Sequence, residues 1–169
     1  MVGRLARAAP DKWSRDLWKI YEQIGYRPLR ARVMGWRPPL KRQCGRPPEW
    51  AETLHVDACD VQQFMHSLHC LLTINGGAKE NWPRVGLEAM AAGVPIVTEK
   101  RWGWLEMIEH GVSGFLGETN EELAEYATVL AHDEARRLEV AVTARRHVER
   151  LADTQAIWQG WQRLLATLS

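Results

Sequence analysis

Short apolar runs alternate with amphipathic stretches along most of this chain. Six apolar runs predict strands, at about residues 1–2, 29–34, 54–56, 70–74, 94–98 and 115–116. The first is expected to be the end of a strand whose beginning is absent. Apolar residues at helical spacing predict helices at about 14–25, 61–69, 83–92, 106–109, 120–131, 133–151 and from 153 onward. Because strands alternate with helices and no linker or repeat divides them, we expect one doubly wound α/β domain over residues 1–169, with about six mainly parallel strands.

The helix predicted between the fourth and fifth apolar runs forms a central βαβ unit. Pro83 suits its first turn, where a missing N–H is harmless, and Gly93 suits its left-handed end. The first amides of a helix have no partner within it and lie at the positive end of the helix dipole. Here they belong to Arg84, Val85 and Gly86, and Gly86 has no side chain to block an approach. We therefore expect an anion-binding site at this helix start.

Two carboxylates flank the same helix start. Glu80 lies in the preceding loop and Glu88 in the second helical turn, with seven residues between them. A carboxylate only accepts hydrogen bonds, so it suits ligand hydroxyls. An anion hole beside two such acceptors predicts a ligand with both phosphate and hydroxyl groups. The alternative is an unrelated α/β domain in which both carboxylates are solvated surface residues.

Composition excludes several classes of function. The 169 residues are 46% hydrophobic and 25% charged, and the net charge of +1 argues against a general nucleic-acid or membrane-surface binder. No apolar run approaches the roughly 18 residues of a transmembrane segment. Three cysteines lack C-x-x-C spacing and the start has no signal-peptide core, so we expect a cytoplasmic protein.

Histidines and tryptophans give weaker indications. His66, His69 and Cys70 could suggest a zinc site, but no further ligand cluster converges on them, so we expect ordinary packing and no metal. Trp82 and Trp102 lie in loops near the proposed ligand. Four other tryptophans follow helical patterns and are expected to pack: Trp13, Trp18, Trp158 and Trp161.

Several motifs occur together in this chain. Glu80-x7-Glu88 is followed by Ala89-Met90-Ala91-Ala92-Gly93-Val94-Pro95-Ile96-Val97, and Gly3-Arg4-Leu5 with Lys12, Met34-Gly35-Trp36 and residues 103–116 add to the set. The combination resembles the donor-binding motifs of retaining, family-4-like glycosyltransferases, whose GT-B fold has two facing Rossmann-like domains. It covers nearly the whole chain, but only the carboxy-terminal, nucleotide-sugar half of such an enzyme. The resemblance thus implies a missing amino-terminal domain that binds the acceptor and that could attach the protein peripherally to a membrane.

The resemblance also implies a role for each candidate residue. Glu88 would accept hydrogen bonds from the ribose, while Glu80 and the backbone of Asn81 and Trp82 would hold the donor sugar. The diphosphate would be held, and stabilised as a leaving group, by Arg4, Lys12 and the helix start at Arg84, Val85 and Gly86. Glu80, Arg4 and Lys12 would thus be the catalytic residues. The donor would be a UDP-, GDP- or ADP-sugar, with no metal and no other cofactor.

Further expectations follow from the resemblance. Residues 36–48 are expected to edge the nucleotide base, and the apolar face of the last helix either covers this domain or docks on the missing one. Many relatives have glycine where this chain has Pro83, whose missing N–H leaves the identity of the sugar open. One alternative is a non-catalytic or truncated nucleotide-binding module. Another is an epimerase or a phosphorylase of the same two-domain plan, which would need a different acceptor side or bound pyridoxal phosphate.

Overall fold

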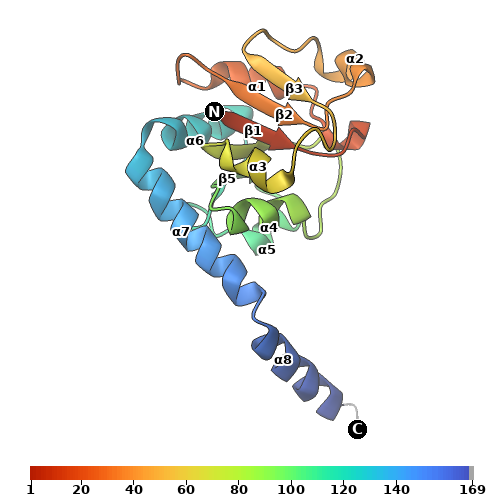
Figure 1. Cartoon of the computed structure of the whole chain (residues 1–169), viewed down its shortest axis with the longest axis vertical. Helices are drawn as coiled ribbons and strands as arrows, with labels where there is room; N and C mark the ends of the chain where they lie inside the picture. Colours follow the sequence, from red (N-terminus) through yellow and green to blue (C-terminus); the bar gives the residue numbers. More distant parts are fainter. Residues whose placement is uncertain (168–169) are drawn as a thin grey trace.

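The computed structural model describes residues 1–167, and their six strands form one sheet (Figure 1). Neighbouring strands are parallel throughout, in the order β3-β2-β1-β4-β5-β6. The strands are β1 Val2–Leu5, β2 Ala31–Met34, β3 Ala51–Leu54, β4 Cys70–Thr73, β5 Ile96–Glu99 and β6 Phe115–Gly117. The prediction of a doubly wound, Rossmann-like α/β fold with mainly parallel strands is confirmed.

Helices cover both faces of the sheet. One face packs against α1 (Leu17–Gln23) and α6 (Asn120–His132). The other packs against α3 (Val61–His66), α4 (Arg84–Ala91) and α5 (Trp104–Met107). Helix α7 (Glu134–Leu151) contacts both α4 and α6. The remaining helices are η1 Pro10–Lys12, η2 Pro38–Leu40, α2 Lys41–Cys44 and α8 Thr154–Ala166.

Strand β1 lies in the middle of the sheet and extends further than expected. The sequence predicted a strand only at residues 1–2, but pairing with β2 continues the strand to Leu5, while pairing with β4 covers Val2 and Gly3. The charged residue Arg4 is thus held in the strand by its pairing with Val33 of β2. The strand order reverses between β1 and β4, and ligands of such sheets bind outside the carboxyl ends of the strands at this point.

The region before and within the first helix also differs from the expectation. Instead of one helix at residues 14–25, the short turn η1 precedes α1, which begins after Asp16. Trp13 and Trp18 are buried, as predicted, and their rings lie against Trp36 at centroid distances of 5.6 and 5.4 Å. This aromatic cluster holds the chain between η1 and α1 in the core. One continuous helix over residues 14–25 would not place the chain there.

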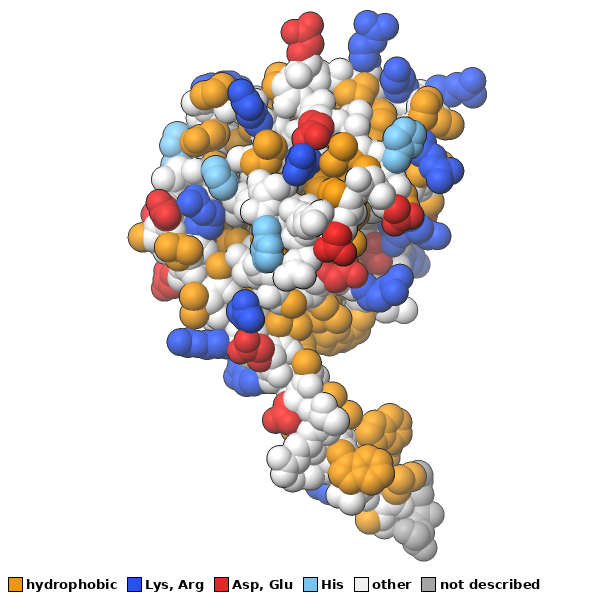
Figure 2. All heavy atoms as spheres, in the orientation of Figure 1, with side chains coloured by type: hydrophobic (Ala, Val, Ile, Leu, Met, Phe, Trp, Pro, Cys, Tyr) orange, Lys and Arg blue, Asp and Glu red, His pale blue; other side chains and the backbone are white. Residues whose placement is uncertain are grey.

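Helix α8 stands away from the sheet at the end of α7 (Figures 1 and 2). The Asp153 carboxylate caps it by accepting from the amides of Gln155 and Ala156 at 2.9 and 3.2 Å. Its apolar side chains are nevertheless exposed, with Trp158 at 61% and Trp161 at 55%. Of the two alternatives for this apolar face, the structure therefore does not show cover of this domain, and docking on a second domain stays a prediction. None of the helices in residues 1–167 combines the length and apolar character needed to cross a bilayer.

Candidate functional site

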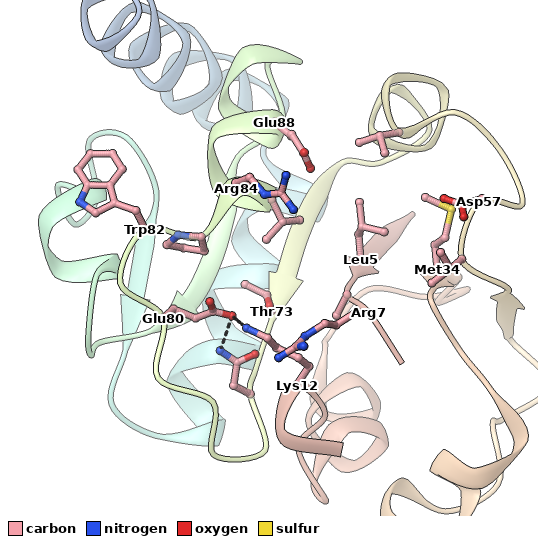
Figure 3. A pocket seen from close by; sticks show the side chains of 16 residues that line it. Leu5, Arg7, Lys12, Met34, Asp57, Thr73, Glu80, Trp82, Arg84 and Glu88 are labelled. Carbon is pink, nitrogen blue, oxygen red and sulfur yellow. Dashed lines mark hydrogen bonds and ion pairs between the residues drawn. The ribbon is translucent and has the colours of Figure 1, made fainter. Parts of the chain in front are cut away.

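A cavity of about 390 Å³ lies at the carboxyl ends of β1 and β4 (Figure 3). Leu5 and Ala6 line it where β1 ends, and Thr73 and Asn75 line it where β4 ends. The start of α4 forms another wall. The cavity therefore occupies the point where the strand order reverses, as expected for a ligand site in an open parallel sheet.

Charged side chains of both signs face this cavity. The cations are Arg7, Lys12 and Arg84, and the carboxylates are Asp57, Glu80 and Glu88. Lys12 Nζ forms an ion pair with Glu80 Oε1, and these two side chains are only 16% and 17% exposed. Asn75 Nδ2 lies 3.4 Å from the same Glu80 oxygen. A mainly buried ammonium–carboxylate pair is thus held in the wall of the cavity between η1 and the loop after β4.

Arg4 is not part of the cavity wall, which corrects the expectation that it grips a diphosphate directly. Its side chain is fully buried beneath the site, with the guanidinium carbon 4.9 Å from the centre of the Trp13 ring. Nη1 donates to Thr73 Oγ1 at 2.8 Å, and Nη2 donates to the carbonyl of Lys12. Burial lowers the pKa of Arg4 to about 10, so it remains charged at neutral pH. Arg4 therefore positions the backbone of Lys12 against the end of β4.

None of residues 36–48 lines the cavity, which corrects their expected base-side role, and Gln43 of this segment instead braces the turn that carries Lys12. Gln43 Nε2 donates to the carbonyl of Pro10 at 2.9 Å. From the other side, the amides of Gly76 and Ala78 both donate to the carbonyl of Asp11 at 2.9 Å. The end of the cavity nearest β2 and β3 is lined instead by Met34, Val56, Asp57 and Val61.

The start of α4 differs in one respect from the expected anion hole. Among the described residues, the amides of Arg84 and Val85 have no backbone acceptor, whereas the Gly86 amide donates to the Pro83 carbonyl at 2.9 Å. Gly86 is buried on the inner side of α4: a Cβ there would lie 2.6 Å from Met107 Sδ and 2.7 Å from the Trp104 ring. Glycine is therefore required for close packing of α4 on α5. It does not serve to open the approach to an anion.

The cavity brings together most, but not all, of the residues that the sequence singled out. Those that line it are Lys12, Glu80, Trp82, Arg84, Val85 and Glu88. Those that do not are Arg4, Asn81 and Gly86. Sequence reasoning missed Arg7, Asn75 and Asp57. Arg7 could have been found, because a basic residue just beyond the carboxyl end of a central strand points toward the edge where ligands bind.

The suggested zinc cluster is not formed. No group of three histidine, cysteine, aspartate or glutamate residues within the described part of the chain could hold a metal ion. His69 Nδ1 lies 3.1 Å from the amino group of Met1, and burial lowers the pKa of His69. Cys70 is buried in β4.

Comparisons with known proteins agree with this fold. The model of the family "Glycosyl transferases group 1" matches residues 51–147. The chain is 39% identical over 80 residues to the amylovoran biosynthesis glycosyltransferase AmsK of Erwinia amylovora, which is 46% of this chain and 20% of AmsK. It is 30% identical over 83 residues to the capsular polysaccharide biosynthesis glycosyltransferase CapM of Staphylococcus aureus, or 48% of this chain and 22% of CapM.

A solved structure extends the similarity over nearly the whole chain. It is that of Anabaena Alr3699/HepE in complex with UDP, with 26% identity, a TM-score of 0.82, and coverage of 98% of this chain and 48% of HepE. The chain therefore spans about half the length of the solved relative, and the matched segments span about a fifth of each curated one.

Proposed function

Since the matched model covers more than half of the chain, this protein belongs to the glycosyl transferases group 1 family, and we propose that it is the donor-binding half of a glycosyltransferase. The cavity binds a nucleoside-diphosphate sugar. The sugar is transferred, with retention of anomeric configuration and without a metal ion, to an acceptor held by an amino-terminal domain. The solved relative carries UDP, so a UDP-sugar is the first donor to test.

The observation that carries this proposal is the arrangement of charge around the cavity. Lys12, Arg7 and Arg84 supply positive charge on several sides, and the free amides of Arg84 and Val85 supply directional donors. A diphosphate needs both kinds of partner, because ammonium and guanidinium groups neutralise charge while backbone amides orient the oxygens. The same groups stabilise the diphosphate as it leaves, which is the task that a metal ion performs in other enzymes.

The remaining walls support the other parts of the donor. Glu88, exposed on the second turn of α4, accepts hydrogen bonds from the ribose. The apolar side chains of Met34, Val56 and Val61 form a surface for the nucleotide base. Glu80, with the backbone of Asn81 and Trp82, holds the donor sugar. In the free chain Lys12 and Glu80 form an ion pair where the sugar end of the site meets its phosphate end.

The exposed face of α8 supports the existence of a second domain. A helix of 13 residues is marginal by itself in water, and its stability comes from burial of its apolar face. Here that face includes the exposed side chains of Ile157, Trp158 and Trp161, and helix α8 itself stands away from the sheet (Figure 1). An amino-terminal domain that packs against these side chains would bury them and would place the acceptor opposite the cavity.

Calorimetry with UDP, GDP and ADP, each with and without EDTA, tests the donor site. We expect at least one nucleotide to bind, with an affinity that EDTA leaves unchanged. Absence of heat with all three nucleotides would contradict the proposal. Affinity that disappears with EDTA would contradict only the metal independence.

A transfer assay distinguishes the half-enzyme from the alternative, a non-catalytic nucleotide-binding module. This chain alone should not transfer radiolabelled sugar from UDP-glucose at ordinary enzyme rates, because the proposed amino-terminal domain is needed to orient the acceptor for attack on the donor. Addition of an amino-terminal half from a relative such as CapM should restore transfer. Nucleotide binding without transfer in any such pairing would favour the module.

A further inference from the structure

We propose that Trp82 and Trp102 form an aromatic platform at the rim of the donor cavity and that this platform binds a pyranose ring of the acceptor saccharide. The inference rests on the proposed function, because an acceptor matters only beside a donor site. It concerns two side chains that have no part in holding the nucleotide.

The two indoles are exposed where other tryptophans of the same region are buried. Trp82 is 44% exposed and Trp102 is 46% exposed, whereas Trp104, two residues further on, is 1% exposed. Leu105 adds to the exposed apolar area at 52%. In the view of Figure 2, hydrophobic side chains gather at the lower edge of the body, near α4 and α5. Clustered exposed aromatic rings mark binding surfaces more often than scattered ones do.

Contacts between two loops join the chain segments that carry these tryptophans. The Gly103 amide donates to the Glu80 carbonyl at 2.6 Å, and a Cβ on Gly103 would lie 1.4 Å from the Asn81 carbonyl oxygen. Lys79 Nζ lies 4.9 Å from the centre of the Trp102 ring. These contacts align residues 79–81 side by side with residues 102–103, so the two indoles lie on neighbouring, tightly joined segments.

The Trp82 ring is fixed by its own contact. Its Nε1 donates to Glu106 Oε2 at 3.3 Å, which ties the indole to α5 just beyond Trp102. An indole that is held in this way loses little further freedom when a ligand packs against it. The platform is therefore organised before any saccharide arrives.

Backbone strain at Trp102 indicates that its side chain has a use. The residue has a φ of 56°, in the left-handed region that glycine adopts readily and bulky residues avoid. The indole is 46% exposed, so burial of the side chain offsets only part of the cost of this conformation. Strained residues of this kind concentrate at binding and catalytic sites. Because tryptophan stands at a position whose backbone conformation favours glycine, we infer that a ligand contacts its side chain.

The position of the platform identifies which sugar it would bind. Figure 3 shows the Trp82 ring on the side of its loop away from Lys12 and Glu88, although the residue also borders the cavity. The cations Lys12 and Arg84 thus point into the cavity, whereas the Trp82 ring points away from it, and Glu80 lies next to Lys12. A pyranose ring packed on Trp82 would therefore lie further from the phosphate site than the donor sugar does. That is the side from which the acceptor must approach.

The chemistry of the surface fits a neutral saccharide. The apolar C–H face of a pyranose packs against an indole, and its hydroxyls need donors and acceptors at the edge of the ring. Lys79, Asn81 and Glu106 supply both kinds of group around the two indoles. CapM, to which this chain is similar, is named for polysaccharide biosynthesis, and this agrees with a saccharide acceptor.

Fluorine NMR of the full chain labelled with 5-fluorotryptophan tests the proposal. Maltotriose and chitotriose serve as probes, with and without saturating UDP. The resonances missing in Trp82→Ala and in Trp102→Gly identify the two indoles. We expect only these two signals to move during titration, and each substitution to weaken saccharide binding by about fivefold or more.

Two controls separate binding from folding. Trp102→Gly relieves the positive φ, so its melting temperature should not fall, and its UDP affinity should stay within about twofold of the parent. Trp158→Ala removes a tryptophan that is at least as exposed, on α8, and should leave saccharide binding unchanged.

The outcomes distinguish this proposal from the proposed function. If UDP binds but neither saccharide moves the two signals, the platform proposal is overturned. It is likewise overturned if Trp158→Ala weakens saccharide binding as much as the platform substitutions do. A third contrary result is a dimer in sedimentation that Trp102→Gly abolishes, together with no response to saccharide, because the two tryptophans would then form a protein interface. If the two signals respond to saccharide but no nucleotide binds, the donor site is wrong and the platform remains.

Discussion

Replacement of Glu80 by glutamine should strengthen UDP binding while it destabilises the free chain. The Glu80 carboxylate occupies Lys12 in the free protein, and a diphosphate must compete with it for the same ammonium. Hydrogen bonds to charged groups contribute about 1.5–3 kcal/mol. Glutamine has the same size as glutamate but carries no charge, so UDP no longer has to displace a carboxylate from Lys12. If this change favours UDP binding by about 1 kcal/mol, UDP should bind about fivefold more tightly.

The free chain should lose stability for the same reason. Glu80→Gln leaves the Lys12 ammonium, 16% exposed, without its anionic partner, which should cost about 1–3 kcal/mol, less than the loss of a fully buried pair. Urea denaturation measures this loss, and calorimetry measures the affinity. UDP in the same excess should raise the free energy of unfolding of the variant by about 1 kcal/mol more than that of the parent, because the variant binds UDP about fivefold more tightly. The difference in free energy of unfolding between variant and parent should therefore be smaller with UDP than without it.

Glu88→Gln is the matched control, because it makes the same chemical change in an exposed carboxylate of the same cavity. It should weaken UDP by about 1–3 kcal/mol, as expected for a lost ribose contact, and leave the urea midpoint of the free chain unchanged. The reasoning fails if Glu80→Gln weakens UDP as much as Glu88→Gln does, or if the free variant is as stable as the parent. Either result would mean that the Lys12–Glu80 pair does not compete with the ligand.

Three further predictions concern the support of the site. Thr73→Val removes the hydroxyl that accepts from the buried guanidinium beneath the cavity and should lower the free energy of unfolding by about 1–3 kcal/mol, whereas Thr73→Ser should restore most of the loss in urea denaturation. Gly86→Ala should cost about 1–3 kcal/mol in the same assay, because its Cβ would lie 2.6 Å from a sulfur atom of α5, whereas Gly160→Ala, with nothing within 4 Å, should instead raise the helical circular dichroism. Burial raises the pKa of the Cys70 thiol to about 12, above the ordinary value of about 8.5, so its contribution to stability is complete below pH 8.5 and is lost as the pH rises toward 12. The urea midpoint should therefore fall above pH 8.5, and Cys70→Ala should reduce that slope.

The central βαβ unit could be predicted from the local sequence pattern. The pattern predicted a strand at 70–74, a helix at about 83–92 and a left-handed stop at Gly93, all of which depend on neighbours within a few residues. The structure has the strand end at Thr73 and the helix at Arg84–Ala91, each bound within one residue of the prediction, and Gly93 has a φ of 70°. The carboxyl ends of parallel strands share one edge, so Glu80, Glu88 and the start of α4 could be assigned to one site from sequence.

The direction of a particular side chain could not be assigned in the same way. Whether Arg4 reaches a ligand or the core depends on how far β1 continues, and that depends on pairing with β2, which comes later in the chain. Gly86 is needed because α5 packs closely against it, and Gln43 contacts the Pro10 carbonyl in η1. Both contacts join segments that are distant in sequence, so no local pattern predicts them.

The residues along the chain by themselves therefore determined the order of strands and helices, the doubly wound class and the edge at which a phosphate-bearing ligand would bind. These properties follow from periodicity and from helix ends, whose physical causes lie within one or two turns of chain. Tertiary structure alone decided that Arg4 is a buried support, that Arg7 faces the cavity, that Lys12 is paired with Glu80 and that Trp82 and Trp102 lie on adjoining loops. Each of these depends on contacts between segments distant in sequence, whose geometry is set only when the sheet and its two helical layers pack together.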